Sequence, residues 1–251
     1  MIDFQGARML VTGGSRGIGA SICRLAAAAG ARVCFGYRIE RAAAELLIEE
    51  IATAGGEAHG VAADLAQPDE AEMLVDDAAS RMGGLDIVIN NAGIWKGSPI
   101  DEMSDGEWNE MIGVNLSGSF FVLRAAIPHL KEGGGGSIVN LSSTAGQRGE
   151  AGHSHYAATK GAVISMTKSL AVELAPFGIR TNCVAPGWVD TEMSRDALEG
   201  ERAESIRAAI PLGRPGSADE IANAVLFMAS PLAGFVNGEV LNVNGGAVLC
   251  G

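Results

Sequence analysis

The chain has 251 residues, of which 47% are hydrophobic and 19% are charged, and its formal net charge is −12. This composition supplies a large hydrophobic core and excludes a disordered chain. A strongly acidic chain without a run of basic residues is also a poor match for nucleic acid or an anionic membrane surface, so we expect neither as a partner.

The amino-terminal residues MIDFQGARML lack the apolar stretch of an export signal, and no apolar run reaches the roughly 18 residues that cross a membrane. The four cysteines, Cys23, Cys34, Cys183 and Cys250, lie far apart, without the paired spacing of a zinc site. We therefore expect a cytoplasmic protein without a metal, in which the first three thiols are free and packed in apolar segments.

Short strand-like segments alternate with longer helical patterns along the chain. The predicted strands span residues 8–13, 31–36, 58–64, 85–90, 136–143, 179–187 and 239–246. The predicted helices span residues 17–30, 41–56, 68–84, 105–130, 156–178 and 217–230. Such alternation predicts an α/β fold: a single doubly wound, Rossmann-type domain over residues 1–251, with about seven parallel strands and helices on both faces.

The first predicted strand leads directly into a Gly-rich turn, TGGSRGIG, at residues 12–19. Gly13, Gly17 and Gly19 allow a tight turn and a close approach of the backbone to a pyrophosphate at the start of the next helix. Their spacing departs from the usual G-x-G-x-x-G dinucleotide fingerprint, so a plain strand–helix turn remains the alternative.

The end of the second predicted strand bears on the choice of cofactor. In VCFGYRIE, Tyr37 and Arg38 stand where an acidic residue would bind the adenosine ribose of NAD. Arg16 and Arg38 can together bind a ribose phosphate, because guanidinium and phosphate geometries match. We therefore expect NADP(H) to be preferred, and Glu40 nearby keeps NAD(H) as an alternative.

The segment SHYAATK places Tyr156 and Lys160 four residues apart, on one face of a helix. A free phenol has a pKa of about 10 and exchanges protons poorly at neutral pH. A nearby cation such as the Lys160 ammonium would lower that pKa and make Tyr156 a tunable acid. A tyrosine and a lysine on a helix surface are the alternative.

Four motifs follow one another along the chain: TGGSRGIG, NNAG at residues 90–93, YAATK at 156–160 and APG at 185–187. In this order and spacing the whole chain resembles the short-chain dehydrogenase/reductase family, and it is similar to the 3-oxoacyl-acyl-carrier-protein reductase branch. The resemblance implies an NADP(H)-dependent oxidoreductase that interconverts a carbonyl and a secondary alcohol by hydride transfer.

The resemblance also implies catalytic roles for four residues. Tyr156 would be the general acid/base, Lys160 would also bind the nicotinamide ribose, and Asn115 would hold a water that connects the lysine to solvent. The serine that binds the carbonyl oxygen would stand thirteen positions before the tyrosine, at Ser143. Ser142 is its competitor, and only one of the two can point into the site because side chains on an extended segment alternate faces.

The implied cofactor contacts come mostly from segments that follow predicted strands. They are Gly13, Ser15, Arg16, Gly17, Ile18, Gly19, Arg38, Asp64, Leu65, Asn91, Ala92, Gly93, Tyr156, Lys160, Pro186, Gly187, Val189 and Thr191.

Residues 188–216 form the one long insertion between predicted elements. Insertions at the carboxyl ends of parallel strands are usually lids over a site, so we expect a substrate lid, with a plain surface excursion as the alternative. His153 and His155 are more typical of a substrate-facing or solvated loop than of a metal site. The expected substrate wall follows strand ends around the same crevice and contains Trp95, Lys96, Gln147, Glu150 and Trp188.

The expected substrate is a small carbonyl compound or alcohol. A 3-oxoacyl thioester on acyl carrier protein is one candidate, but the uncharged stretches 133–136 and 175–178 disfavour an acidic carrier, although Lys131, Arg148 and Lys168 remain available. An NAD(P)-dependent sugar, polyol or hydroxy-ketone dehydrogenase is the main alternative. A non-catalytic nucleotide-sensing protein is a more distant one.

The predicted helix at 156–178 bears on oligomerisation. Its residues Val163, Met166, Leu170 and Leu174 can face the core of the chain. Small residues elsewhere on it allow a second helix to approach closely, although they could equally pack within the monomer: Ala157, Ala158, Gly161, Ala162, Ser165 and Ser169. Together with the family resemblance, this pattern leads us to expect a homotetramer.

Overall fold

The computed structural model describes residues 2–250 and is built on a seven-stranded parallel sheet with strand order β3-β2-β1-β4-β5-β6-β9. The strands are β1 Arg8–Val11, β2 Arg32–Tyr37, β3 Glu57–Ala62, β4 Ile87–Asn90, β5 Gly136–Leu141, β6 Ile179–Pro186 and β9 Val240–Val243. Every predicted strand is therefore confirmed to within a few residues at its ends. The strand order reverses between β1 and β4, and in such sheets the crevice at this reversal is where ligands bind.

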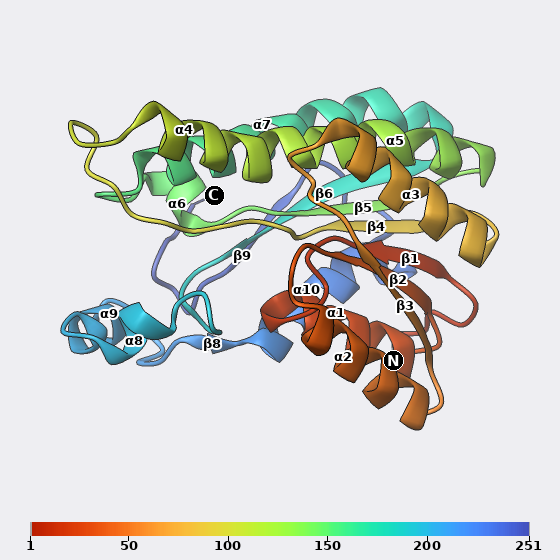
Figure 1. Cartoon of the computed structure of the whole chain (residues 1–251), viewed down its shortest axis with the longest axis horizontal. Helices are drawn as coiled ribbons and strands as arrows, with labels where there is room; N and C mark the ends of the chain where they lie inside the picture. The colour runs from red at the N-terminus through yellow and green to blue at the C-terminus, as the bar shows by residue number, and fades with distance from the viewer. Residues whose placement is uncertain (1, 251) are drawn as a thin grey trace.

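Helices cover both faces of the sheet, with α3, α4, α5 and α7 on one face and α1, α2 and α10 on the other (Figure 1). The helices are α1 Gly17–Ala28, α2 Arg41–Thr53, α3 Pro68–Met82, α4 Asp105–Ile112, α5 Gly118–Glu132, α6 Thr144–Arg148, α7 Ser154–Leu174, α8 Arg195–Glu199, α9 Ala203–Ala208 and α10 Ala218–Ala229. Short 3-10 turns follow α7 at Ala175–Phe177 and α10 at Pro231–Ala233. The doubly wound α/β architecture is therefore confirmed.

Alternate residues of the central strands belong to two separate hydrophobic clusters, one under each helical layer. On β1, Met9 and Val11 pack into one cluster and Leu10 packs into the other. Cys34 on β2 is buried, as are Cys23 and Cys183, whereas Cys250 is exposed, and all four thiols are free. The strands therefore read as continuous apolar runs because both of their faces are covered.

The predicted helix at 105–130 is interrupted. A π-helical turn, Gly113–Ser117, separates α4 from α5 and contains Asn115. The combined stretch Asp105–Glu132 is long and apolar enough to cross a membrane by length and composition, which the search for apolar runs in the sequence missed. In the structure it packs against α3 and α7 in the layer that covers the sheet (Figure 1).

The insertion at 188–216 has its own small structure, which the sequence patterns did not predict. Two short parallel strands, β7 Val189–Asp190 and β8 Gly216–Ser217, pair at its base. Between them α8 and α9 bury Leu198, Ile206 and Ile210 in a separate cluster, against which Trp188 packs. This segment projects at one end of the molecule (Figure 1).

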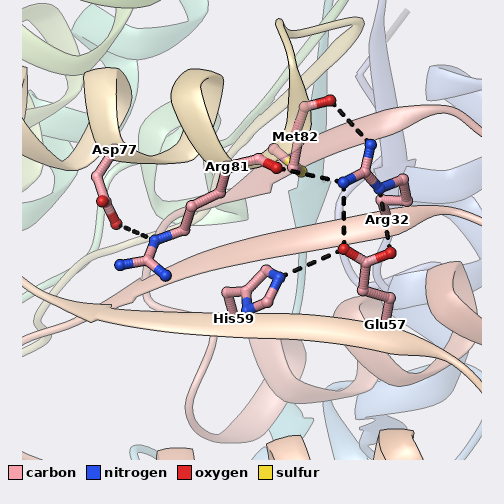
Figure 2. Close-up of polar contacts among 6 residues, drawn as sticks. All are labelled: Arg32, Glu57, His59, Asp77, Arg81 and Met82. Carbon is pink, nitrogen blue, oxygen red and sulfur yellow. Dashed lines mark hydrogen bonds and ion pairs between the residues drawn. The ribbon is translucent and has the colours of Figure 1, made fainter.

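A polar network ties the outer strands to the C-terminus of α3 (Figure 2). The Arg32 guanidinium on β2 donates to both carboxylate oxygens of Glu57 on β3, at 3.1 and 3.2 Å. It also donates to the Met82 and Arg81 carbonyls, at 2.9 and 3.2 Å. A cation at the C-terminal end of a helix satisfies its last carbonyls and matches its dipole, so Arg32 stabilises the end of α3.

Candidate active site

A cleft of about 320 Å³ opens at the carboxyl ends of the strands. Ser143 and every expected cofactor-contacting residue line it: Gly13, Ser15, Arg16, Gly17, Ile18, Gly19, Arg38, Asp64, Leu65, Asn91, Ala92, Gly93, Tyr156, Lys160, Pro186, Gly187, Val189 and Thr191. Asn115 is fully buried behind the cleft wall. The fold therefore brings the expected residues, which are scattered over the sequence, to one place.

The glycines at positions 13, 17 and 19 of the Gly-rich turn cannot be replaced without strain or a clash. Gly13 and Gly17 have φ angles of 64° and 54°, which favour glycine. A Cβ at Gly13 would lie 2.9 Å from the Ala92 Cα atom, and one at Gly19 would lie 2.1 Å from the Gly13 carbonyl oxygen. The backbone at the start of α1 is thus open to the cleft, as binding of a pyrophosphate at a helix N-terminus requires.

Thr12 holds the NNAG segment against this turn, a role that the sequence analysis missed. Its Oγ1 accepts hydrogen bonds from the backbone N–H groups of Asn91 and Ala92, both at 2.9 Å. The Asn91 amide in turn donates to the carbonyls of Thr12 and Gly13, at 2.9 and 3.1 Å. The position of Thr12 directly before the glycines is the feature of the sequence that could have indicated this role.

The two arginines of the expected phosphate clamp have different surroundings. Arg38 is exposed and follows β2 at the rim of the cleft. Arg16 lies 3.1 Å from a Glu40 carboxylate oxygen and 3.9 Å from one of Glu192. Glu192 also lines the cleft and was not expected from the sequence. A phosphate at this rim would compete with these two carboxylates for Arg16.

The neighbouring serines have separate partners. Ser142 is buried, and its Oγ donates to the Lys160 carbonyl at 2.8 Å. Both serines line the cleft, and the Ser143 Oγ accepts from the Ala145 N–H at 3.1 Å as the N-cap of α6. A further hydrogen bond from Ser143 to the Tyr156 phenol lowers the pKa of that phenol. Ser143 is therefore the serine that faces the candidate reacting centre.

Burial governs the ionisation of both Tyr156 and Lys160. Burial raises the pKa of Tyr156 to about 12, the Ser143 hydrogen bond lowers it and the charge of Glu150 raises it further. Burial also lowers the pKa of Lys160 to about 8. The Lys160 Nζ lies 5.8 Å from the Tyr156 ring centroid and donates to the Leu141 carbonyl at 2.9 Å. Desolvation is the main cause of the shift in the phenol pKa, and the lowering of that pKa by the Lys160 charge stays a prediction.

Asn115 is clamped to the backbone after the NNAG segment. Its Oδ1 accepts from the Ile94 N–H at 2.8 Å, and its Nδ2 donates to the Ile94 carbonyl at 2.9 Å. A Cβ at Gly93 would lie 3.2 Å from this Oδ1 and 3.5 Å from the Lys160 Nζ, so Gly93 lies beside both groups. The π-helical turn thus brings Asn115 to the rear of the lysine, and such turns occur frequently at functional sites.

Of the expected substrate wall, Trp95, Glu150 and Trp188 line the cleft. Lys96 instead contacts Glu110, with both carboxylate oxygens within 2.8 Å of its Nζ. Gln147 donates to the Asn242 Oδ1 at 2.6 Å. These two predictions were wrong, because each side chain finds a polar partner outside the cleft.

The two histidines also separate. His153 stacks on Trp95, with ring centroids 4.5 Å apart and parallel planes. His155 is buried, so the expectation of a solvated or substrate-facing position is wrong for it. Burial lowers the pKa of His155, which favours the neutral imidazole. Neither ring is among the residues that line the described cleft.

The arrangement can hold a dinucleotide and move a proton. The Gly-rich turn and the arginine rim suit the phosphates, and the Ser143 and Tyr156 hydroxyl groups suit a carbonyl oxygen. A phenol that retains its proton at neutral pH can donate it to an oxygen that becomes an alkoxide.

Comparisons with known proteins agree with this geometry. A family model described as Enoyl-(Acyl carrier protein) reductase matches residues 13–248. The chain is 41% identical over 237 residues to the 3-oxoacyl-acyl-carrier-protein reductase FabG of Staphylococcus aureus, covering 94% of this chain and 96% of that protein. It is 42% identical over 247 residues to FabG of Aquifex aeolicus, covering 98% of each. A crystal structure of a short chain dehydrogenase from Burkholderia cenocepacia in complex with NADP superposes with a TM-score of 0.92 at 39% identity, covering 97% of this chain and 98% of that one. With its fold, its motifs and these relatives in agreement, the chain belongs to the short-chain dehydrogenase/reductase family.

Proposed function

We propose that this protein is an NADP(H)-dependent oxidoreductase that interconverts a carbonyl and a secondary alcohol, with Tyr156 as the proton donor and acceptor. The observation that carries the proposal is the half-buried Tyr156, which lines the cleft and whose phenol is hydrogen-bonded by Ser143. NADPH supplies the hydride in the reducing direction. The NADP named for the Burkholderia structure supports this choice of cofactor, as does Arg38 at the cleft rim.

The residues of this chain would divide the work as follows. The Ser143 hydroxyl binds the carbonyl oxygen and orients it toward the phenol. Tyr156 donates its proton to that oxygen as negative charge develops there, and in the oxidising direction it removes the proton. Asn115 is hydrogen-bonded to the Ile94 backbone and lies behind Lys160. There it would hold a water through which the lysine exchanges protons with solvent. At neutral pH Lys160, whose pKa is about 8, would carry a positive charge near the phenol.

The phenol pKa sets the pH range in which Tyr156 can donate or accept a proton. With a pKa of about 12, Tyr156 is protonated at neutral pH and suited to donate a proton. Removal of a proton from an alcohol needs the phenolate, whose population grows as pH rises. At neutral pH the resting protein therefore holds Tyr156 in the form that can donate a proton to a carbonyl oxygen.

Reduction of a 3-oxoacyl thioester is the substrate class that the relatives support. The corner that we expected to disfavour a carrier protein is not free of positive charge. The Gly136 N–H donates to the Gly178 carbonyl at 3.1 Å, so the two uncharged stretches are neighbours. Lys131 lies beside them, with its Nζ 3.8 Å from the Phe177 ring centroid. A cation at this corner supports an acidic carrier as one partner.

A sugar, polyol or hydroxy-ketone substrate is the second candidate. Glu150 supports it, because its carboxylate lines the cleft and can accept hydrogen bonds from substrate hydroxyl groups. A thioester offers no such donors near its carbonyl. The two candidate substrates therefore differ in whether they donate hydrogen bonds to Glu150.

Two structural roles belong to the same proposal. The chain would form one domain over residues 1–251, with residues 188–216 as a lid. The lid is supported by four residues that come from this segment and line the cleft: Trp188, Thr191, Glu192 and Met193.

A cytoplasmic homotetramer would form through α7, where Val163 and Leu174 are buried but Ala158, Ser165 and Ser169 are exposed. Sedimentation as a monomer at micromolar concentration would contradict the tetramer.

The decisive experiment measures NADPH and NADH consumption on acetoacetyl thioesters, diketones, keto sugars and aromatic ketones. Wild type and Tyr156→Phe are compared, because the substitution removes only the hydroxyl group. We expect turnover by wild type and a loss of about 100-fold or more in Tyr156→Phe. Tight NADPH binding without turnover across the panel would favour a nucleotide-sensing protein instead.

A further inference from the structure

Two tryptophans meet across the substrate end of the cleft. The Trp95 and Trp188 rings are 5.6 Å apart between centroids and stand at 87°, an edge-to-face contact. Trp95 follows β4 and Trp188 follows β6, and the sheet order places β5 between these strands. Neighbouring strands lie about 4.8 Å apart, so the two indoles close a span of roughly 10 Å.

The element that they bridge is the one that carries Ser143. This serine is the second residue after the end of β5, and it lines the same cleft as both indoles and Tyr156. The two indoles therefore line the same cleft as the groups that would bind the carbonyl oxygen. A carbon chain attached to the reacting carbonyl would have to pass this bridge in order to extend.

Trp95 is held in place by contacts on three sides. His153 stacks on its face at a centroid distance of 4.5 Å, and Trp188 meets it edge to face. The indole N–H donates to the Glu150 carboxylate at 3.3 Å. The loop behind it is tied down as well, because the Ser98 N–H donates to the Gly152 carbonyl at 2.8 Å. A ring held in this way does not swing aside at low cost.

Trp188 is anchored from the opposite side. Its carbonyl accepts from the Gly216 N–H at 2.9 Å, where β7 and β8 close the base of the insertion. Its side chain packs against the buried cluster of Leu198, Ile206 and Ile210. The position of Trp188 is thus coupled to the whole segment 188–216.

We propose that Trp95 and Trp188 form a size filter that admits carbonyl substrates with short or compact chains and excludes long linear chains. The inference rests on the proposed function and narrows its substrate class. Aromatic faces and edges also offer apolar contact to a short chain, so the filter favours small apolar substituents rather than only excluding large ones.

The test uses a series of 3-oxoacyl N-acetylcysteamine thioesters with four, eight and twelve acyl carbons. For wild type, kcat/KM is expected to fall by about tenfold or more from the shortest to the longest thioester, as a pocket of limited size requires. In Trp95→Ala this fall should shrink to less than about threefold, chiefly through a gain on the longest thioester. Trp95→Phe, which keeps an aromatic ring of smaller size, should lie between the two.

Trp108→Ala is the matched control. Trp108 lies on α4, is 41% exposed and is not among the residues that line the cleft. The chain has three tryptophans, and Trp108 is the one outside the filter, so this variant loses the same side chain at a site that should not alter chain-length preference. An equal change of preference in Trp108→Ala would overturn the filter.

Binding separates a failure of the filter from a failure of the proposed function. The 3-hydroxyacyl thioesters are titrated into the protein with NADPH, a combination in which no hydride can be transferred. Weaker binding of the twelve-carbon than of the four-carbon compound by wild type, relieved in Trp95→Ala, supports the filter whether or not turnover is seen. Equal affinity across chain lengths, or the same preference in wild type and Trp95→Ala, overturns it.

Discussion

The Ser142 hydroxyl donates a hydrogen bond to the Lys160 carbonyl at 2.8 Å, so Ser142 positions the helix that carries the lysine. Ser143 lines the cleft and bonds the phenol. We expect Ser143→Ala to lower kcat by about 100-fold, because it removes a donor to the developing oxyanion. Ser142→Ala should instead lower stability by about 1–2 kcal/mol, because it removes a buried hydrogen bond.

Steady-state kinetics and urea unfolding of both variants measure this difference. The two serines are adjacent in sequence, so each variant is the other's control. An equal loss of kcat in both variants would show that the roles are not divided in this way.

Lys160 is expected to lower the free energy of unfolding, because its ammonium group is buried. Burial lowers its folded-state pKa from 10.5 to about 8, so the penalty is fully present below pH 8. Between that pH and 10.5 the unfolded chain binds more protons than the folded one, and stability therefore rises with pH. Lys160→Met removes this dependence and should abolish turnover.

The check is urea unfolding of wild type and Lys160→Met without cofactor at pH 7 and pH 10. From pH 7 to pH 10 the free energy of unfolding of wild type should rise relative to that of Lys160→Met, by up to about 3 kcal/mol. This amount is the free-energy equivalent of the pKa shift. A difference that does not change with pH would contradict a buried, charged lysine.

Arg38 is expected to select the phosphorylated cofactor. Loss of a charge-assisted contact to phosphate costs about 1.5–3 kcal/mol, so Arg38→Ala should weaken NADPH binding by roughly 10- to 100-fold and change NADH binding little. Arg41→Ala is the control, because Arg41 lies nearby but pairs with Glu45 at 2.8 Å. Titration calorimetry with both nucleotides distinguishes them, and equal affinity of wild type for NADPH and NADH would refute this role.

Asp86 is expected to make the free energy of unfolding depend on pH in the acidic range. The Arg8 guanidinium donates to both of its oxygens, at 2.8 and 2.6 Å, and holds the pKa of the carboxyl below 3.8. This stability is present above pH 3.8 and is lost as pH falls through the lower, folded-state pKa. Asp86→Asn should therefore cost about 1 kcal/mol at pH 7, since the pair is partly exposed, and progressively less toward pH 3.

Thermal or urea unfolding over this pH range provides the measurement. Asp101→Asn, in an exposed turn, is the matched control and should follow the wild-type curve. A constant difference between Asp86→Asn and wild type down to pH 3 would exclude the ion pair as its cause.

The sequence by itself determined the architecture and the composition of the site. Apolar segments of strand length alternate with helical patterns, and this alternation predicts a parallel sheet. Each strand is apolar on both sides, so helices are expected to cover both faces of the sheet. The glycines at positions 13, 17 and 19 can be recognised in the sequence, because a positive φ at Gly13 and Gly17 and close packing at Gly13 and Gly19 disfavour any other residue. Spacing likewise placed Tyr156 and Lys160 on one helical face.

Tertiary structure decided what spacing alone leaves open. The resemblance favoured Ser143 over Ser142, but the hydrogen-bond partners of each hydroxyl group are known only from the folded structure. Lys96 and Gln147 do not line the cleft, because Glu110 and Asn242 lie within their reach. The pKa of Tyr156 depends on burial, which is a property of the packed whole. The contact between Trp95 and Trp188 joins residues from two strands that flank a third. Such contacts arise from distances in space, and the distance between two side chains far apart in a sequence is set only when the intervening chain has folded.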